Sequence, residues 1–392
     1  MKITKIDIIP VWYEVTDAYN QLFGSGKKPG ASVHSREGWF ADIDYKENVF
    51  VKMHTDEGIV GWGEATAHPV TSETQAGLVA TIKLFGDMII GKDPFQIGAF
   101  HAAWDHMFLQ ANAGARSALD IAVHDIMGKA TGLPIYKLLA GGYYQTRFGL
   151  MGTMPRAEPK VMAEMCKEHM TRGYTCFEPK MTGHKESLDA DADRLEAILD
   201  VVPQSCLIMA DPNQGWGTAK DSIELMRRRF PTTPNLAIEQ PIMYYDLIGL
   251  EQITRAIPQK VIADEALQNL PTTIEVVSKR MADMTSFKLG KCGGFYKAMQ
   301  MIRASEAMNV PVRIDWTQGS HLLDTGTGHL HACVRLVACD PGMDYQLRIK
   351  DKPVAEGGVY IENDQFVMPD TPGLGLTVDE DVIKRLSERK SL

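Results

Sequence analysis

The stretch YTCFEPK, residues 174–180, is the first of six short apolar runs that each end in a charged side chain. The later runs are CLIMAD (206–211), LAIE (236–239), KVIAD (260–264), MTSFK (284–288) and VRID (312–315). Their last residues are 31, 28, 25, 24 and 27 positions apart, enough for one strand and one helix per step, and helical patterns such as DADRLEAILDVV lie between them. This repeat predicts an α/β fold with a parallel sheet closed into a (β/α) barrel. An open doubly wound sheet is the alternative.

The part of the chain before this repeat has a different pattern. ITKIDIIPVWYEV (3–15) and ENVFVKMHTDEGIVGWGEA (47–65) are strand-like, the second with a hairpin turn at 56–58, and residues 71–139 have a helical pattern. The segment 17–45 is rich in Gly, Ser, Lys and Pro, which is typical either of a lid or binding loop or of a poorly ordered surface.

Composition narrows the class of protein. A net charge of -9 argues against a nucleic-acid or anionic-membrane partner, because little would offset phosphate repulsion. The six cysteines are scattered without a C-x-x-C pair, so neither a zinc site nor a disulfide framework is indicated. No apolar stretch reaches the length of about 18 residues that a spanning helix needs. We therefore expect a cytoplasmic enzyme or binding protein.

Three carboxylates end consecutive runs: Asp211, Glu239 and Asp264. In a barrel the carboxyl ends of the strands converge on one mouth, so these acids should lie side by side. Carboxylates so close together repel one another unless a cation lies between them. A site with only oxygen ligands selects Mg²⁺, Mn²⁺ or Ca²⁺. We expect Mg²⁺, with Mn²⁺ as a possible substitute, and Asn213 and Glu265 as supporting neighbours. The alternative is that each acid caps the next helix.

Lys180 and Lys288 end the runs on either side of the acidic trio. A dication nearby should lower the pKa of each lysine and make it a usable base. Two such lysines could remove a proton from one face of a substrate and return it to the other. The alternative is that both are surface salt-bridge residues.

These motifs together resemble the enolase superfamily, and specifically its muconate lactonizing enzyme subgroup, over nearly the whole chain. The segments that carry the resemblance are FEPKMTG (177–183), MADPNQGW (209–216), AIEQP (237–241), IADEAL (262–267), SFKLGKCGGFYKAM (286–299), GIVGWGEA (58–65), SALDIAVHDIMGKATGLPIYKLLAGG (117–142) and PGLGLTVDED (372–381). The resemblance implies a (β/α)₇β TIM-like barrel at 131–354. It also implies an α+β capping domain at 1–130, to which a tail from about 355 to 392 returns.

The resemblance also implies the chemistry. Mg²⁺ would stabilise the enediolate that forms when the proton α to a substrate carboxylate is removed. Asp324, in LLDTGTG (322–328), falls where the subgroup usually has a strand-eight Glu beside this intermediate. GKCGG after Lys288 is interpreted as a tight turn and not as a phosphate cradle, because it lacks the Walker spacing.

One position departs from the subgroup's pattern. The subgroup usually has Lys-x-Lys at the end of strand two, and this chain has Glu178 in the first of these positions. Glu178, with Asp315 beside Trp316, could favour a substrate with a cationic nitrogen, such as an amino-acid derivative or a betaine. Alternatively, Glu178 pairs with Lys180 or another basic neighbour.

Several functions remain open at this point. Lysines on both faces fit an isomerase best, namely a racemase or epimerase of a small-molecule carboxylate, and we expect a homo-oligomer. A muconate-type cycloisomerase, or a lyase that dehydrates acid sugars or hydroxy acids, uses the same groups. Outside the superfamily, the alternatives are a barrel glycosidase with Glu239 and Asp264 as its carboxylates, and a non-catalytic metal-binding scaffold.

Overall fold

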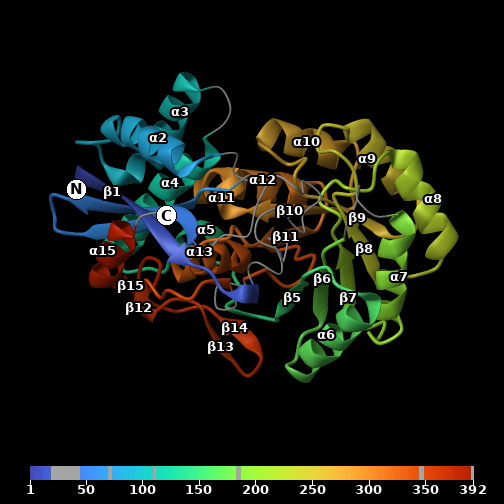
Figure 1. Cartoon of the computed structure of the whole chain (residues 1–392). Helices are drawn as coiled ribbons and strands as arrows, with labels where there is room; N and C mark the ends of the chain where they lie inside the picture. Colours follow the sequence, from blue (N-terminus) through green and yellow to red (C-terminus); the bar gives the residue numbers. More distant parts are fainter. Residues whose placement is uncertain (19–44, 69–72, 109–111, 182–186, 344–347, 390–392) are drawn as a thin grey trace.

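The computed structural model describes residues 1–18, 45–68, 73–108, 112–181, 187–343 and 348–389. The possible lid or binding loop at 17–45 lies almost entirely outside these residues, as does the end of the FEPKMTG motif. Figure 1 shows two parts side by side: an α+β cap, mostly blue and cyan, and a larger barrel that runs from green to orange.

The cap is built on a three-stranded antiparallel sheet in the order β1-β2-β3. Its elements are β1 (Ile3–Glu14), β2 (Tyr45–Thr55), β3 (Val60–Thr66), α2 (Gln75–Asp87), η1 (Pro94–Gln96), α3 (Ile97–Met107) and α4 (Ala113–Thr131). Helix α4 packs directly on β3, where a Cβ at Gly63 would lie 2.0 Å from the carbonyl oxygen of Ala118. Only glycine allows this close approach. Buried apolar residues such as Phe85, Trp104 and Leu119 form the core between the sheet and the helices.

The second part is a curled parallel sheet of seven strands in the unbroken order β5 to β11. The strands are β5 (Met151–Met154), β6 (Cys176–Pro179), β7 (Leu207–Ala210), β8 (Leu236–Glu239), β9 (Lys260–Ala263), β10 (Met284–Lys288) and β11 (Val312–Asp315). Sequential order without a reversal is typical of a barrel and excludes the doubly wound alternative.

Helices follow each of these strands, and the longer ones cover the outside of the sheet (Figure 1). They are α6 (Pro159–Thr171), α7 (Leu188–Leu199), α8 (Ala219–Arg229), α9 (Leu247–Ala256), α10 (Leu270–Ser278), α11 (Leu289–Cys292), α12 (Phe295–Ala307) and α13 (His321–Ala332), and α5 (Ile135–Ala140) precedes the first strand. Their N-termini are set by the sequence: the side chain of Ser187 caps α7, and Thr218 and Asp221 form a capping box at the start of α8.

The two edges of the curled sheet meet. Val337 bridges Val312 of β11 in parallel, so this segment takes the place of an eighth strand. Shortly after it, Asp340 accepts a 2.8 Å hydrogen bond from the backbone N–H of Gly149, just before β5. The interior holds a cluster of buried apolar side chains, against which Ala338 and Cys339 pack. The cluster consists of Met151, Cys176, Met209, Ala237, Ile262 and Met284.

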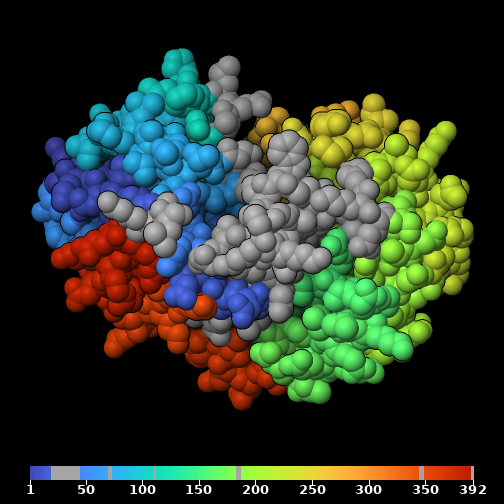
Figure 2. Space-filling model, viewed as in Figure 1, coloured from blue at the N-terminus to red at the C-terminus, as the bar shows by residue number. Residues whose placement is uncertain are grey.

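The end of the chain returns to the cap. Its elements are β12 (Val354–Gly357), β13 (Tyr360–Glu362), β14 (Gln365–Val367), β15 (Leu376–Val378) and α15 (Glu380–Glu388), and β14 also pairs with β4 (Arg147–Phe148). Helix α15 packs on β1, and Glu380 forms a 2.6 Å ion pair with Lys52 of β2. Figure 2 shows the same arrangement on the surface, with the red C-terminal residues next to the blue N-terminal ones. Among the described residues, no helix has the length and apolar character to cross a membrane.

Candidate active site

Five buried carboxylates gather at the carboxyl ends of the barrel strands. Their oxygen atoms form two groups within 4.8 Å that share Glu239: one adds Glu178 and Asp211, and the other adds Asp264 and Asp315. The three acids predicted to hold a metal therefore lie together, joined through Glu239. Two further acids of the predicted set, Glu178 and Asp315, each belong to one of these groups.

Glu239 has the feature that most favours a cation. Its Oε2 atom accepts a hydrogen bond from Arg313, whereas its Oε1 atom is buried and has no hydrogen-bond partner among the described residues. Burial raises the pKa of Glu239 well above its usual value even though Arg313 opposes the shift. A buried carboxylate oxygen without a donor is costly, and the oxygen-only set around it suits a divalent cation such as Mg²⁺. The residues present thus fit the metal that the sequence predicts.

Lys180 and Lys288 point into this cluster from its two ends. The Nζ atom of Lys180 contacts the carboxylates of Glu178 and Asp211. The Nζ atom of Lys288 lies 2.5 Å from Asp264 and 2.8 Å from Asp315. Because these are buried ion pairs, the alternative that both lysines belong to surface salt bridges is wrong.

The protein's own groups shift the lysine pKa values upward. Burial alone would lower the pKa of Lys180, but Asp211 and Glu178 outweigh burial and raise it. Asp264 and Asp315 raise the pKa of Lys288 in the same way. The lowered pKa expected from the sequence depends on a neighbouring dication, which would compete for the same carboxylates.

Arg313, in the middle of β11, is a site residue that sequence reasoning missed. Its side chain is fully buried, and its Nη2 atom lies 2.5 Å from Glu178 and 2.8 Å from Asp315. Burial would raise the pKa of Glu178, but Lys180 and Arg313 outweigh it and hold the pKa at about 2. Glu178 thus pairs with basic neighbours, which was the alternative interpretation of this departure. The available signal was an arginine inside the apolar run VRID, two residues before Asp315 and therefore on the same face of the strand.

Lys291 is the second residue that was missed. Its Nζ atom contacts the Asp264 carboxylate and lies 2.5 Å from the Asp264 carbonyl oxygen. Burial would raise the pKa of Asp264, but Lys288 and Lys291 outweigh it and lower the pKa. Lys291 lies in α11, a four-residue turn of helix, so the interpretation of GKCGG as a tight turn is confirmed.

The structure also places the remaining predicted residues. The backbone N–H of Asn213 donates to Asp211 (2.8 Å), and Glu265 accepts a 2.9 Å hydrogen bond from Gln214. Trp316 directly follows Asp315 and is buried. The strand-eight position expected for Asp324 is wrong: Asp324 is buried in the first turn of α13, the helix that follows the seventh strand β11. The insertion of α13 between β11 and the bridge at Val337 explains the difference.

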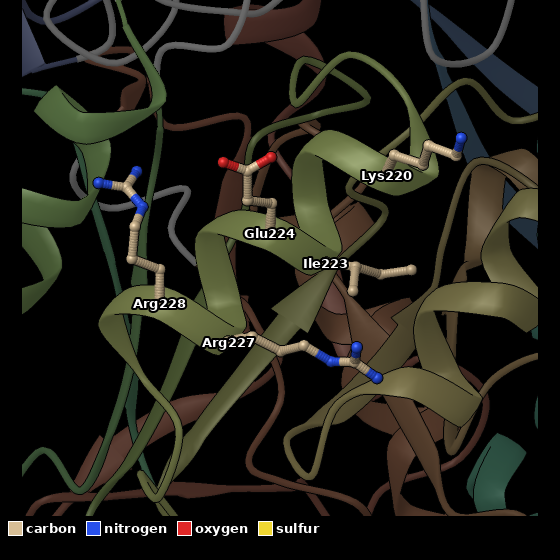
Figure 3. Close-up of a pocket in the computed structure, with 5 residues that line it drawn as sticks. All are labelled: Lys220, Ile223, Glu224, Arg227 and Arg228. Atoms are coloured by element: carbon tan, nitrogen blue, oxygen red, sulfur yellow. The ribbon is translucent and has the colours of Figure 1, made fainter.

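A separate surface hollow lies on the outer helix α8. It is lined by Lys220, Ile223, Glu224, Arg227 and Arg228 (Figure 3). The side chains spread away from one another over the outside of the barrel, and none belongs to the buried acid cluster. This hollow is therefore not part of the candidate active site.

Comparisons with known proteins cover both parts of the structure. Residues 161–382 match the family model described as enolase C-terminal domain-like. Residues 40–140 match the model of the mandelate racemase / muconate lactonizing enzyme N-terminal domain.

Relatives with named activities are similar over most of their length. The hydrophobic dipeptide epimerase of Enterococcus faecalis is 32% identical over 339 residues, which is 86% of this chain and 93% of the relative. A crystal structure of dipeptide epimerase from Enterococcus faecalis, complexed with Mg and the dipeptide L-Leu-L-Tyr, superposes with a TM-score of 0.83 at 28% identity over 96% of this chain and 100% of that one. The N-succinyl Arg/Lys racemase from Bacillus cereus superposes with a TM-score of 0.86 at 25% identity over 98% of each chain.

Proposed function

Because the chain belongs to the mandelate racemase / muconate lactonizing enzyme family of the enolase superfamily, we propose that it is a magnesium-dependent racemase or epimerase of an amino-acid derivative. Its epimerase and racemase relatives make it an isomerase. They leave no support for the barrel glycosidase or the non-catalytic scaffold. One observation carries the proposed reaction: Lys180 and Lys288 contact opposite ends of one buried acid cluster.

The metal ligands in this proposal are Asp211, Glu239 and Asp264. Mg²⁺ bound there would supply positive charge that offsets the negative charge developing on a substrate carboxylate when its α proton leaves. Mn²⁺ has similar ligand preferences and should substitute. The partnerless Oε1 atom of Glu239 is the observation that supports this ligand set.

The two lysines would share the proton transfer. Lys180 follows β6 and Lys288 ends β10, and the three ligand-bearing strands β7, β8 and β9 lie between them in the sheet. A substrate held over the acids would therefore have one ammonium or amine group on each side. One lysine must be neutral to accept the α proton, while the other, still protonated, returns a proton to the opposite face. Asp211 and Asp264 tune this balance, because each is the acid that most raises the pKa of its own lysine.

The charge around Glu178 favours one kind of amino-acid derivative. Glu178 is already paired with Lys180 and Arg313, so its carboxylate is not available to balance a cationic substrate nitrogen. We therefore favour a substrate whose α nitrogen is acylated and neutral, such as a dipeptide or an N-acyl amino acid, over a betaine. The proposal retains the expectation of a cytoplasmic homo-oligomer.

Deuterium exchange tests this function. The protein is incubated with Mg²⁺ in D₂O and a library of dipeptides, N-acyl amino acids, betaines and hydroxy acids, and ¹H NMR follows loss of the α proton and inversion at the α carbon. The wild type should exchange and invert an N-acylated substrate. Lys180→Ala and Lys288→Ala should each abolish inversion and block exchange of one enantiomer, whereas the exposed control Lys279→Ala should behave as the wild type.

Two results would reject the proposal: exchange that persists in excess EDTA, or exchange by the Lys180→Ala/Lys288→Ala double variant. Loss of water from a hydroxy acid without inversion would instead identify a lyase that uses the same groups.

A further inference from the structure

Arg313 is the most deeply buried cation of the candidate site, and the proposed reaction gives it no role. Its guanidinium contacts three carboxylates: Nη1 binds Oε2 of Glu239, and Nη2 binds Glu178 (2.5 Å) and Asp315 (2.8 Å). Only one of these acids, Glu239, is a proposed metal ligand. Arg313 therefore links the proposed ligand set to the two acids that stand outside it.

The two outside acids create a problem for a one-metal enzyme. Each of the two acid groups that share Glu239 brings three carboxylate oxygens within 4.8 Å of one another, a set that could hold a dication with waters. Five carboxylates in one pocket could accept two dications, or could draw one of them toward Glu178 and away from Asp211 and Asp264. Either outcome would misplace the charge relative to the two lysines.

We propose that Arg313 is a positioning residue that restricts the site to one dication, held by Asp211, Glu239 and Asp264. This inference rests on the metal site of the proposed function. A guanidinium stays charged at every accessible pH, and its fork geometry lets it hold several carboxylate oxygens at once. The lysines that pair with Asp211 and Asp264 can lose a proton when a dication binds, so those two acids stay open to the metal. Arg313 cannot lose its charge, so it keeps Glu178 and Asp315 in ion pairs and repels a second dication.

Arg313 also determines which oxygen of Glu239 remains for the metal. Because Nη1 occupies Oε2, only Oε1 is left, and this is the buried oxygen without a partner. A carboxylate with one oxygen tied to arginine can offer only the other to a cation, which fixes the direction from which the cation is bound. The same residue thus orients the central ligand and holds Glu178 and Asp315 in ion pairs.

The charge balance of the pocket supports this role. The five carboxylates contact four cationic side chains, namely Lys180, Lys288, Lys291 and Arg313, so one negative charge is in excess when all five acids are ionised. Without Arg313 the excess would double, and three carboxylates would lose a donor together. Such a pocket should bind cations more tightly and with less discrimination.

Mn²⁺ titration of the metal-free full-length protein tests the proposal. Calorimetry gives the stoichiometry and affinity, and electron paramagnetic resonance distinguishes isolated from coupled Mn²⁺. The wild type should bind one ion. Arg313→Met should bind a second, magnetically coupled ion or bind the first at least about tenfold more tightly. Arg313→Lys, which keeps a charge, should stay at one ion, and the double variant Arg313→Met/Glu178→Gln should lose the gain.

Glu178→Gln keeps the test decisive if Arg313→Met does not fold. Because Glu178 is not a ligand in this proposal, the affinity of this variant for Mn²⁺ should stay within about threefold of the wild type. A loss of tenfold or more would make Glu178 a ligand and overturn the inference, as would a folded Arg313→Met protein with one ion and unchanged affinity. A wild type that binds no dication would instead reject the proposed function itself.

Discussion

The Ser320 hydroxyl, at the N-terminus of α13 in the barrel, donates a 2.6 Å hydrogen bond to the buried carboxylate of Glu64 in the cap sheet. The same carboxylate accepts hydrogen bonds from Tyr13 (3.0 Å) and Asn48 (2.6 Å), and from the backbone N–H of Ser320 (3.1 Å). These contacts lie a few residues after Asp315. The cap is therefore fixed to the barrel at the loop that follows the last strand of the active site.

Replacing this hydroxyl should weaken the joint. Ser320→Ala removes both the donor to Glu64 and the side-chain cap that accepts from Leu322, so the free energy of unfolding should fall by about 1 to 3 kcal/mol. Urea unfolding at pH 7.5 measures this change. Ser278→Ala, whose hydroxyl is exposed at the end of α10, is the matched control and should change little. An equal effect of the two substitutions would show that the joint contributes no stability.

Two buried histidines should make the protein sensitive to acid. Burial lowers the pKa of His331 to about 3 and that of His329 to about 4, from a usual value of 6.5. Between pH 6.5 and these lowered pKa values, the two histidines bind protons in the unfolded chain but not in the folded protein. The free energy of unfolding therefore falls as the pH falls below 6.5. The slope is at most about 1.4 kcal/mol per pH unit for each histidine.

Urea midpoints at pH 7.5, 6.0 and 5.0 check this expectation. His331→Leu should reduce the loss between pH 6.0 and 5.0, because one of the two groups no longer titrates. His106→Leu, which replaces a histidine on the surface of α3, is the control and should keep the wild-type slope. A wild type equally stable at all three pH values would contradict the assignment of neutral, buried histidines.

The affinity for a dication should depend on pH through Asp211. Burial raises the pKa of Asp211 to about 7, although Lys180 opposes the shift. A protonated carboxyl is a poor ligand, so Mn²⁺ should bind more weakly below pH 7, by up to about tenfold per pH unit. Calorimetric titrations at pH 6.0 and 8.0 measure this difference. Asp211→Asn should bind weakly with a smaller dependence on pH, and identical wild-type affinities at both values would contradict the raised pKa of Asp211.

The sequence predicted the members of the site that end strands and missed those that do not. Lys180 and Glu239 were found because an apolar run followed by a charged residue has a simple geometric meaning in a barrel. Arg313 lies inside its run, and its inward direction follows only once the strand is known to alternate. Lys291 lies in the turn after β10, where its side chain bends back to Asp264. No periodic pattern in the sequence predicts that a side chain in a turn contacts the end of a neighbouring strand.

Contacts between distant segments were also beyond the sequence. Glu64 and Ser320 are 256 residues apart, and neither lies in a pattern that pairs one with the other. The position of Asp324 was inferred from a resemblance in LLDTGTG, but this segment forms the helix α13 and not an eighth strand. Local apolar runs specify the elements; the way in which loops between them fold back is decided by tertiary packing.

Gly294 tests the fit of the cap against the barrel most directly. It begins α12 with φ 96°, and a Cβ there would lie 2.4 Å from the Cβ of Asp120 in α4. Asp120 in turn accepts a 2.6 Å hydrogen bond from the backbone N–H of Phe295, so the two elements cannot move apart without losing this contact. Gly294→Ala should therefore cost more than backbone strain alone, about 3 kcal/mol or more. Gly58→Ala is a control for positive φ without a close contact, because Gly58 has φ 77° and no atom near its Cβ position, and it should cost only about 1 to 2 kcal/mol. Urea unfolding compares the two variants: equal losses would mean that α4 and α12 adjust freely. A larger loss for Gly294→Ala is expected from the contact with Asp120 together with its φ 96°, ψ −176° backbone, a region open almost only to glycine.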